Sequence, residues 1–182
     1  DIFVRHGLHI GRSTQCDWVS AAADLLTPLA ELEQHLTVQS AALWTDDTPV
    51  NVLVGGEEGS RQGRFWTYVG DDEHPYSVYS FTMSRSRDGP QQFLQNYRGY
   101  LHADAYAGYD AIYLGNESGV IEVACWAHAR RKFFDARTSY PRQAHQVLEW
   151  IQQLYDIEDR ARPLTAIARC ALRGAEANPV LD

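Results

Sequence analysis

The sequence has little cysteine and no long apolar run. Its three cysteines, Cys16, Cys125 and Cys170, are odd in number and widely spaced, which argues against a disulfide framework and is typical of a reducing cytoplasm. No run approaches the roughly 18 apolar residues that span a bilayer, and no signal-peptide pattern is present. We therefore expect a cytoplasmic protein with no membrane partner.

Positive charge is also scarce. Sixteen basic residues stand against 24 acidic ones, for a net charge of −8, so a surface that holds DNA by bulk electrostatics is not expected. A DNA substrate would need a local basic patch or segments outside this chain. The 182 residues suit one domain of about 100–150 residues with an appendage. The chain stops within a helical pattern, so we expect a piece of a longer protein.

Residues 1–38 have helical periodicity. Apolar residues recur with a spacing near 3.6 from Trp18 to Leu36, and Pro28 is expected to kink or divide this helix. A packing helix that connects domains is the simpler interpretation. A helix-turn-helix remnant with its turn at Gly11 is the alternative.

From residue 40 onward, short strand-like runs replace this pattern and then alternate with helices. Thr48 and Pro49 are expected to end the first strand, with 51–54 extending it past a bulge. The first three strands should form a meander, and helical crossovers to the later ones favour parallel pairing. This is a ribonuclease-H-like α/β arrangement, a five-stranded mixed sheet with flanking helices. We expect strands at 41–46, 63–69, 76–82, 101–104 and 120–125, and helices at 88–97, 106–113 and 126–137.

Two acids lie at the ends of strands that this topology makes parallel neighbours. Asp46 ends the first strand and Asp104 ends the fourth, so we expect their carboxylates to lie at one edge of the sheet. Each has a structural alternative, because Asp46 suits a turn and Asp104 suits a helix cap. Asp47 is an adjacent candidate, but strand alternation points it to the opposite face.

The helix after the last strand carries a histidine and a basic run. His128 lies in its first turn, at the expected edge of the acids, where it could contact a scissile phosphate or serve only as a capping or surface residue. Arg130, Arg131 and Lys132 could position DNA phosphates, or form a solvated helix face. Cys125 and His128 resemble half a zinc site, but the sequence supplies no second half, so zinc is rejected.

Four segments carry a pattern that is specific in combination: TDDTPV at 45–50, GRFWTYV at 63–69, LHADAYAGY at 101–109 and CWAHARRKFF at 125–134. Together they resemble the insertion-sequence-66 family, bacterial transposases of the DDE class. The resemblance covers nearly the whole chain and implies a ribonuclease-H-like fold with a helical insertion before the last catalytic acid. On this basis we divide the chain into an N-terminal helical segment (1–39), a catalytic core (40–138) and the start of the insertion (139–182).

The resemblance implies metal-dependent DNA transposition. Enzymes of this class cut transposon ends and transfer strands with three acids and Mg²⁺ or Mn²⁺. By the match, Asp46 is the first acid and Asp104 the second. The third, a glutamate, lies in a motif that this chain lacks, and Glu149 and Glu158 fall in the insertion helices. We therefore expect a core fragment that is inactive alone. Its partners would be DNA and a homo-oligomer on paired ends, at the bacterial nucleoid.

Two other functions suit the same residues. A ribonuclease-H-like nuclease or Holliday-junction resolvase would use similar acids. A non-catalytic remnant that binds DNA or protein would need none of them, and it is compatible with the acidic balance and the missing glutamate.

Overall fold

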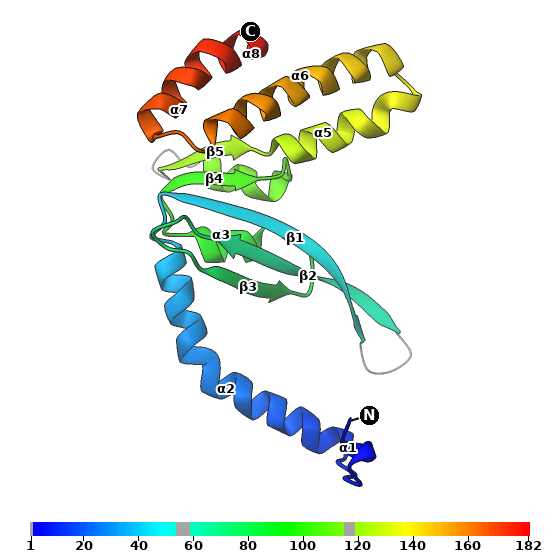
Figure 1. Ribbon diagram of the computed structural model, residues 1–182. Coiled ribbons are helices and arrows are strands. Elements are labelled where there is room, and N and C mark those ends of the chain that lie inside the picture. The colour runs from blue at the N-terminus through cyan, green and yellow to red at the C-terminus, as the bar shows by residue number, and fades with distance from the viewer. Residues whose placement is uncertain (1, 54–58, 115–118) are drawn as a thin grey trace. The chain divides into compact units, whose positions relative to one another are not determined.

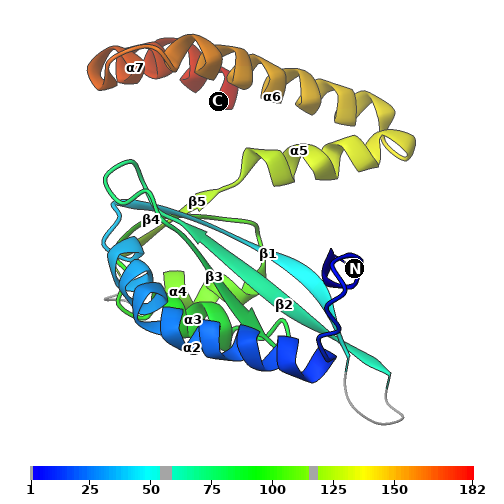
Figure 2. The same ribbon diagram turned by 60° about the horizontal axis from the view of Figure 1, so that its bottom comes forward.

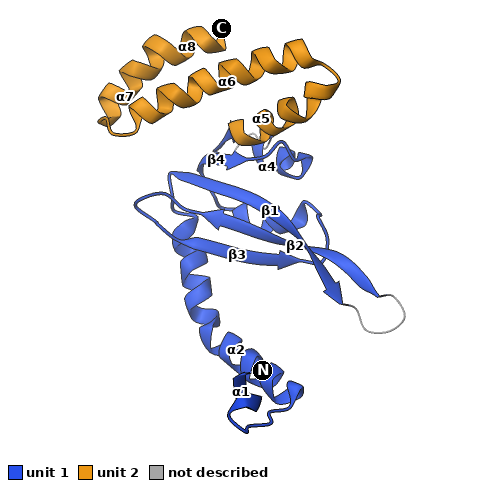
Figure 3. Ribbon diagram, turned by 45° about the vertical axis from the view of Figure 1, so that its right-hand side comes forward, with its two compact units in different colours: residues 1–124 blue, residues 125–182 orange. Residues whose placement is uncertain are grey.

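The chain folds into two compact units, 1–124 and 125–182 (Figure 3). The computed structural model describes residues 2–53, 59–114 and 119–182. The first unit is built on a five-stranded sheet in the order β3-β2-β1-β4-β5 (Figure 1). The second unit is helical. The strands are β1 (Ala42–Leu53), β2 (Ser60–Val69), β3 (Ser77–Thr82), β4 (Gly99–Ala103) and β5 (Val120–Ala124).

The strand directions confirm the predicted topology. The strands β1, β2 and β3 form an antiparallel meander, whereas β4 pairs in parallel with both β1 and β5. The parallel pairings follow from the crossovers, because a chain that leaves one strand through a helix returns in the same direction. The fold is a ribonuclease-H-like α/β fold, as predicted.

The first strand is longer than predicted. Pro49 was expected to end it, but β1 continues through this residue and pairs with β2 as far as Leu53. Pairing between β1 and β4 stops at Trp44, and no described strand pairs with that edge of β1 beyond this point. A proline, which has no N–H to donate, is tolerated where a strand edge is free.

One face of the sheet carries the hydrophobic core. Trp66 and Tyr68 on β2 and Leu101 on β4 are completely buried. The helices α3 (Asp88–Leu94) and α4 (Asp110–Tyr113) cover this face (Figure 2). The Tyr68 and Phe93 rings stack with their centroids 3.6 Å apart and their planes 4° from parallel. Stacking and burial of these aromatic rings fix α3 on the sheet.

The two crossover helices are shorter than predicted. The helix expected over 88–97 ends at Leu94, where the chain turns through a hydrogen bond from the Tyr97 N–H to the Leu94 carbonyl. The helix expected over 106–113 is divided into a 3₁₀ turn, Ala107–Tyr109, and α4. Both segments remain helical, and both contribute residues to the core.

The start of β4 requires a glycine. Gly99 has φ +145°, and a Cβ at this position would lie 2.5 Å from the Ala41 carbonyl oxygen. The next residue, Tyr100, donates its N–H to the same carbonyl. The close approach of these two backbones sets the β1–β4 register.

The turn between β2 and β3 is tied to the start of β1 by one carboxylate. Asp71 accepts hydrogen bonds from the N–H groups of Ala41 (2.7 Å) and His74 (3.0 Å) and from the His74 ring (3.2 Å). Burial alone would raise the pKa of Asp71, but these hydrogen bonds outweigh it and hold the pKa below its usual value. The ionised carboxylate therefore stabilises this end of the sheet.

The N-terminal helices are α1 (Ile2–Arg5) and α2 (Arg12–Thr37). Pro28 lies inside α2, which is one helix with a bend along its length (Figure 1), as the kinking alternative predicted. Among the described residues of α2, only Thr37 is buried. Its apolar side chains are largely exposed, and Leu25 reaches 81 %.

The second unit consists of α5 (Trp126–Asp135), α6 (Pro141–Ala161), α7 (Ala166–Leu172) and α8 (Asn178–Leu181). The helix α6 buries Ile151, Leu154 and Ile157, whose spacing gives one apolar face. Residues 2–53, 59–114 and 119–182 include no helix long and apolar enough to cross a membrane.

Candidate active site

Two adjacent acids on β1 lie on opposite faces of the sheet. Asp47 shares the core face with buried Leu43 and Thr45, and its side chain is only 2 % exposed. Asp46 is exposed on the other face, as the alternation predicted. Its Oδ1 accepts the Asp47 N–H at 2.8 Å, which restrains the carboxylate.

The pairing of β1 with β4 ends two residues before Asp46 and Asp104. Trp44 pairs with His102 across the two parallel strands, and their rings stack with centroids 5.0 Å apart. Two residues further along each strand, the same register leads to Asp46 and Asp104. Asp104 directly follows the last residue of β4, Ala103. Asp46 was predicted to end the first strand, but it lies within β1, which continues to Leu53.

The Asp104 carboxylate has two fixed contacts. Its Oδ1 accepts the Tyr106 N–H at 3.2 Å, a contact within the turn before the 3₁₀ segment. The N-cap of that segment is Tyr106 and not Asp104, so the predicted helix-capping role was wrong. The Asp104 Oδ2 accepts a hydrogen bond from Nη2 of Arg85 at 3.3 Å. The side chain is 22 % exposed, so it remains open to solvent.

Arg85 joins Asp104 to the buried acid on β1. Arg85 lies in the loop between β3 and α3. It donates to Asp47 Oδ1 from Nη2 at 2.7 Å and from Nε at 3.0 Å. Arg64 on β2 donates to Asp47 Oδ2 at 2.8 Å. Both oxygens of Asp47 are therefore neutralised by arginines. Burial alone would lower the pKa of Arg85, but Asp47 and Asp104 raise it above its usual value.

Neither arginine was among the residues predicted for the site. Arg64 shares the core-facing side of β2 with Trp66, and a buried Asp47 needs a cation nearby, so this pair could have been found from alternation alone. Arg85 lies in a loop with no periodic pattern. Its contact with Asp47 depends on the tertiary structure.

Two tyrosines support the site from the core side. The Tyr109 hydroxyl lies 3.2 Å from the Thr45 hydroxyl, and burial raises the pKa of Tyr109 so that it stays protonated. The Tyr106 ring lies 4.0 Å from the Arg85 guanidinium carbon, and its hydroxyl donates to the Arg85 carbonyl. Both tyrosines are packing and positioning residues.

The donor chemistry of the site suits a hard divalent cation. Carboxylate oxygens are the ligands that Mg²⁺ prefers, and Mg²⁺ keeps several waters. The guanidinium at Asp104 Oδ2 shows that this oxygen already attracts a cation. Among the described residues, no group of three His, Cys, Asp or Glu side chains could hold a metal ion. Asp46 and Asp104 each supply a carboxylate of this chemical kind.

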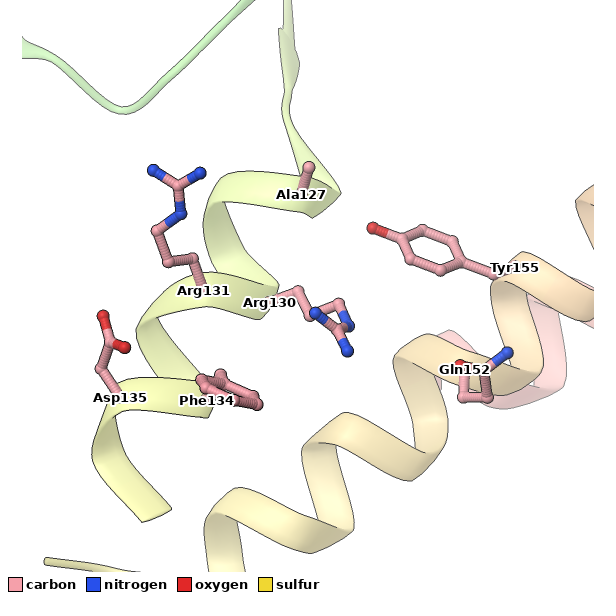
Figure 4. A pocket seen from close by; sticks show the side chains of 7 residues that line it. All are labelled: Ala127, Arg130, Arg131, Phe134, Asp135, Gln152 and Tyr155. Carbon is pink, nitrogen blue, oxygen red and sulfur yellow. The ribbon is translucent and has the colours of Figure 1, made fainter. Parts of the chain in front are cut away.

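The other predicted residues lie on α5 in the second unit. His128 is half-buried in the first turn, while Arg130, Arg131 and Lys132 are exposed. Arg130 and Arg131 line a cavity of about 680 Å³ between α5 and α6 (Figure 4). The other lining residues are Ala127, Phe134, Asp135, Gln152 and Tyr155. The predicted contact between His128 and a scissile phosphate stays a prediction.

Comparison with known proteins decides the family. A sequence profile described as "Transposase IS66 family" matches residues 1–182. The chain belongs to the IS66 transposase family. This confirms the resemblance drawn from the four sequence segments, and IS66 transposases are DNA-processing enzymes as a class.

Relatives of this IS66 family chain occur in Sinorhizobium fredii (strain NBRC 101917 / NGR234). The uncharacterized protein y4hP is 30% identical over 201 aligned positions, covering 99% of this chain and 36% of that protein. The uncharacterized protein y4qI is 26% identical over 192 positions, with the same coverage. The chain thus spans about a third of the length of the curated relatives it matches.

Proposed function

We propose that this chain is the core of a DDE transposase that cuts DNA at transposon ends and transfers the strands to a target. The observation that carries the proposal is the parallel β1–β4 register, which leads to Asp46 and Asp104 on neighbouring strands in a chain of the IS66 family. DNA is the partner, and a homo-oligomer on paired ends is the working assembly. The segments 1–39, 40–138 and 139–182 are the proposed domains.

Asp46 and Asp104 are the proposed ligands of Mg²⁺ or Mn²⁺. Divalent ions bound in such sites activate the attacking oxygen and stabilise the leaving oxygen at phosphorus. The chain's own contribution is to hold the two carboxylates in place. The Asp47 N–H restrains Asp46 and the Tyr106 N–H restrains Asp104. On α5, His128 is the proposed contact to the scissile phosphate, and Arg130, Arg131 and Lys132 position the DNA backbone.

The third acid is proposed to lie outside this chain. Glu158 was one candidate, but both of its carboxylate oxygens accept hydrogen bonds from Arg173 at 2.6 Å. Arg173 also lowers the pKa of Glu158. Such a bidentate ion pair gives Glu158 a structural role in the second unit. We expect the chain alone to give no strand transfer, and robust strand transfer would refute the argument about the third acid.

Manganese binding tests the assignment of the two acids. Mn²⁺ is titrated into the chain, and the free ion is followed by electron paramagnetic resonance. We expect Asp46→Asn and Asp104→Asn each to weaken binding about tenfold or more, because carboxylates supply most of the affinity for a hard cation. Asp72→Asn, an exposed acid of the β2–β3 turn, is the control for loss of one charge. Wild-type affinity in both active-site variants would refute the proposal in favour of a non-catalytic binding module.

DNA binding tests the basic run separately. Replacing Arg130, Arg131 and Lys132 together by glutamine should weaken binding to duplexes of any sequence, because phosphate contacts carry no sequence information. The dependence of log K on log salt concentration should become shallower by about 0.9 for each phosphate that the variant no longer neutralises. Arg142→Gln, an exposed arginine on α6, is the control. An unchanged salt slope in the triple variant would show that these residues do not contact DNA.

A further inference from the structure

Arg85 forms ion pairs with both Asp47 and Asp104. We propose that Arg85 is a positioning residue that competes with the divalent cation for Asp104 and withdraws to Asp47 when the cation binds. This inference rests on the proposed function of Asp104 as a metal ligand.

The contacts of Arg85 are unequal in a way that favours such a movement. Its Nη2 lies 2.7 Å from Asp47 but 3.3 Å from Asp104. Hydrogen bonds between charged groups are strongest near 2.7–2.9 Å, so the bond to Asp104 is the weaker one. Arg85 can give up Asp104 without losing Asp47.

Asp47 can hold the Arg85 guanidinium but is too enclosed to bind the metal ion. Its side chain is 2 % exposed, and each of its oxygens already accepts a hydrogen bond from an arginine. Asp104 is more open, at 22 %. A divalent cation can therefore reach Asp104, whereas Asp47 remains the anchor of Arg85.

Tyr106 links this movement to the backbone. Its N–H restrains Asp104, its ring packs on the Arg85 guanidinium and its hydroxyl holds the Arg85 carbonyl. The loop backbone is thus fixed while the end of the side chain has two carboxylate partners. A cation at Asp104 would repel the guanidinium and leave Asp47 as its one acidic partner.

The first test measures Mn²⁺ affinity in arginine variants of this loop. Arg85→Gln should tighten Mn²⁺ binding by roughly two- to fivefold, the range for an ion pair whose guanidinium is more than a third exposed. Arg87→Gln is the matched control. Arg87 is an exposed arginine two residues further along the same loop. Unchanged or weaker binding in Arg85→Gln would overturn the proposal.

A second measurement uses the wild-type chain and so does not depend on how the variant folds. The Nε–H resonance of Arg85 is followed by nuclear magnetic resonance during addition of Mg²⁺. We expect it to shift with Mg²⁺ in the wild type and to stay constant in Asp104→Asn. A constant Arg85 resonance during saturable Mg²⁺ binding overturns this inference alone. Failure of the wild type to bind either ion overturns the proposed function as well.

Discussion

Replacing Asp47 by asparagine removes a buried charge that two arginines neutralise, while Asp46→Asn next to it changes an exposed carboxylate. The two variants should therefore differ in stability. Removing one partner of a buried ion pair costs about 3–5 kcal/mol. Arg64 and Arg85 are 18 % and 37 % exposed, and solvent screening reduces the expected cost to about 2–3 kcal/mol.

Asp46→Asn should stay within about 0.5 kcal/mol of the wild type, as surface substitutions usually do. An asparagine oxygen can still accept the Asp47 N–H. Urea unfolding followed by near-ultraviolet circular dichroism measures both variants, and in thermal scans Asp47→Asn should lower Tm by roughly 4–12 °C. Equal stability of the two variants, or a larger loss in Asp46→Asn, would refute the assignment of a structural role to Asp47 and a binding role to Asp46.

Three other predictions concern the framework of the sheet. Asp71→Asn should destabilise the chain at neutral pH, because it removes the ionised carboxylate. The folded-state pKa of Asp71 is depressed, so the wild type loses the stability contributed by this carboxylate as pH falls through that pKa. The urea midpoints of the wild type and the variant should therefore converge in acid. Gly99→Ala should cost about 1–3 kcal/mol in urea unfolding, since φ is +145° and the new Cβ meets the Ala41 carbonyl; wild-type stability would contradict the close approach. Phe93→Ala should cost about 3–5 kcal/mol by the same assay through loss of its stack on Tyr68, and a change below about 1 kcal/mol would contradict it.

The sheet could be predicted from sequence because local and global signals agree there. Aromatic and β-branched runs define β2 and β3, and the helices between later strands require parallel pairing. Pro49 was the exception. Its effect depends on which strand edge is free, and the local sequence does not contain that information.

The candidate site could be predicted only in part. Asp46 and Asp104 were selected from expected strand ends and family segments, and the β1–β4 pairing was implied by topology. Asp46 lies within β1 and not at its end. The role of Asp47 and Arg85 was not predicted. A buried acid and its loop cation are recognised by burial and distance, which arise only when β1, β2 and the loop before α3 are assembled.

The parallel β1–β4 pairing also has a consequence for the order of folding. The β1–β2–β3 meander joins consecutive strands, so its contacts close short loops. The pairing of β1 with β4, which precedes Asp46 and Asp104 along the chain, joins strands separated by the whole meander and α3. Contacts between distant parts of a chain form slowly, because the entropy of closing a long loop is lost before the contact stabilises it. The two acids should therefore come together late, after most of the sheet has formed, and a newly made chain would acquire its candidate site only at the end of folding.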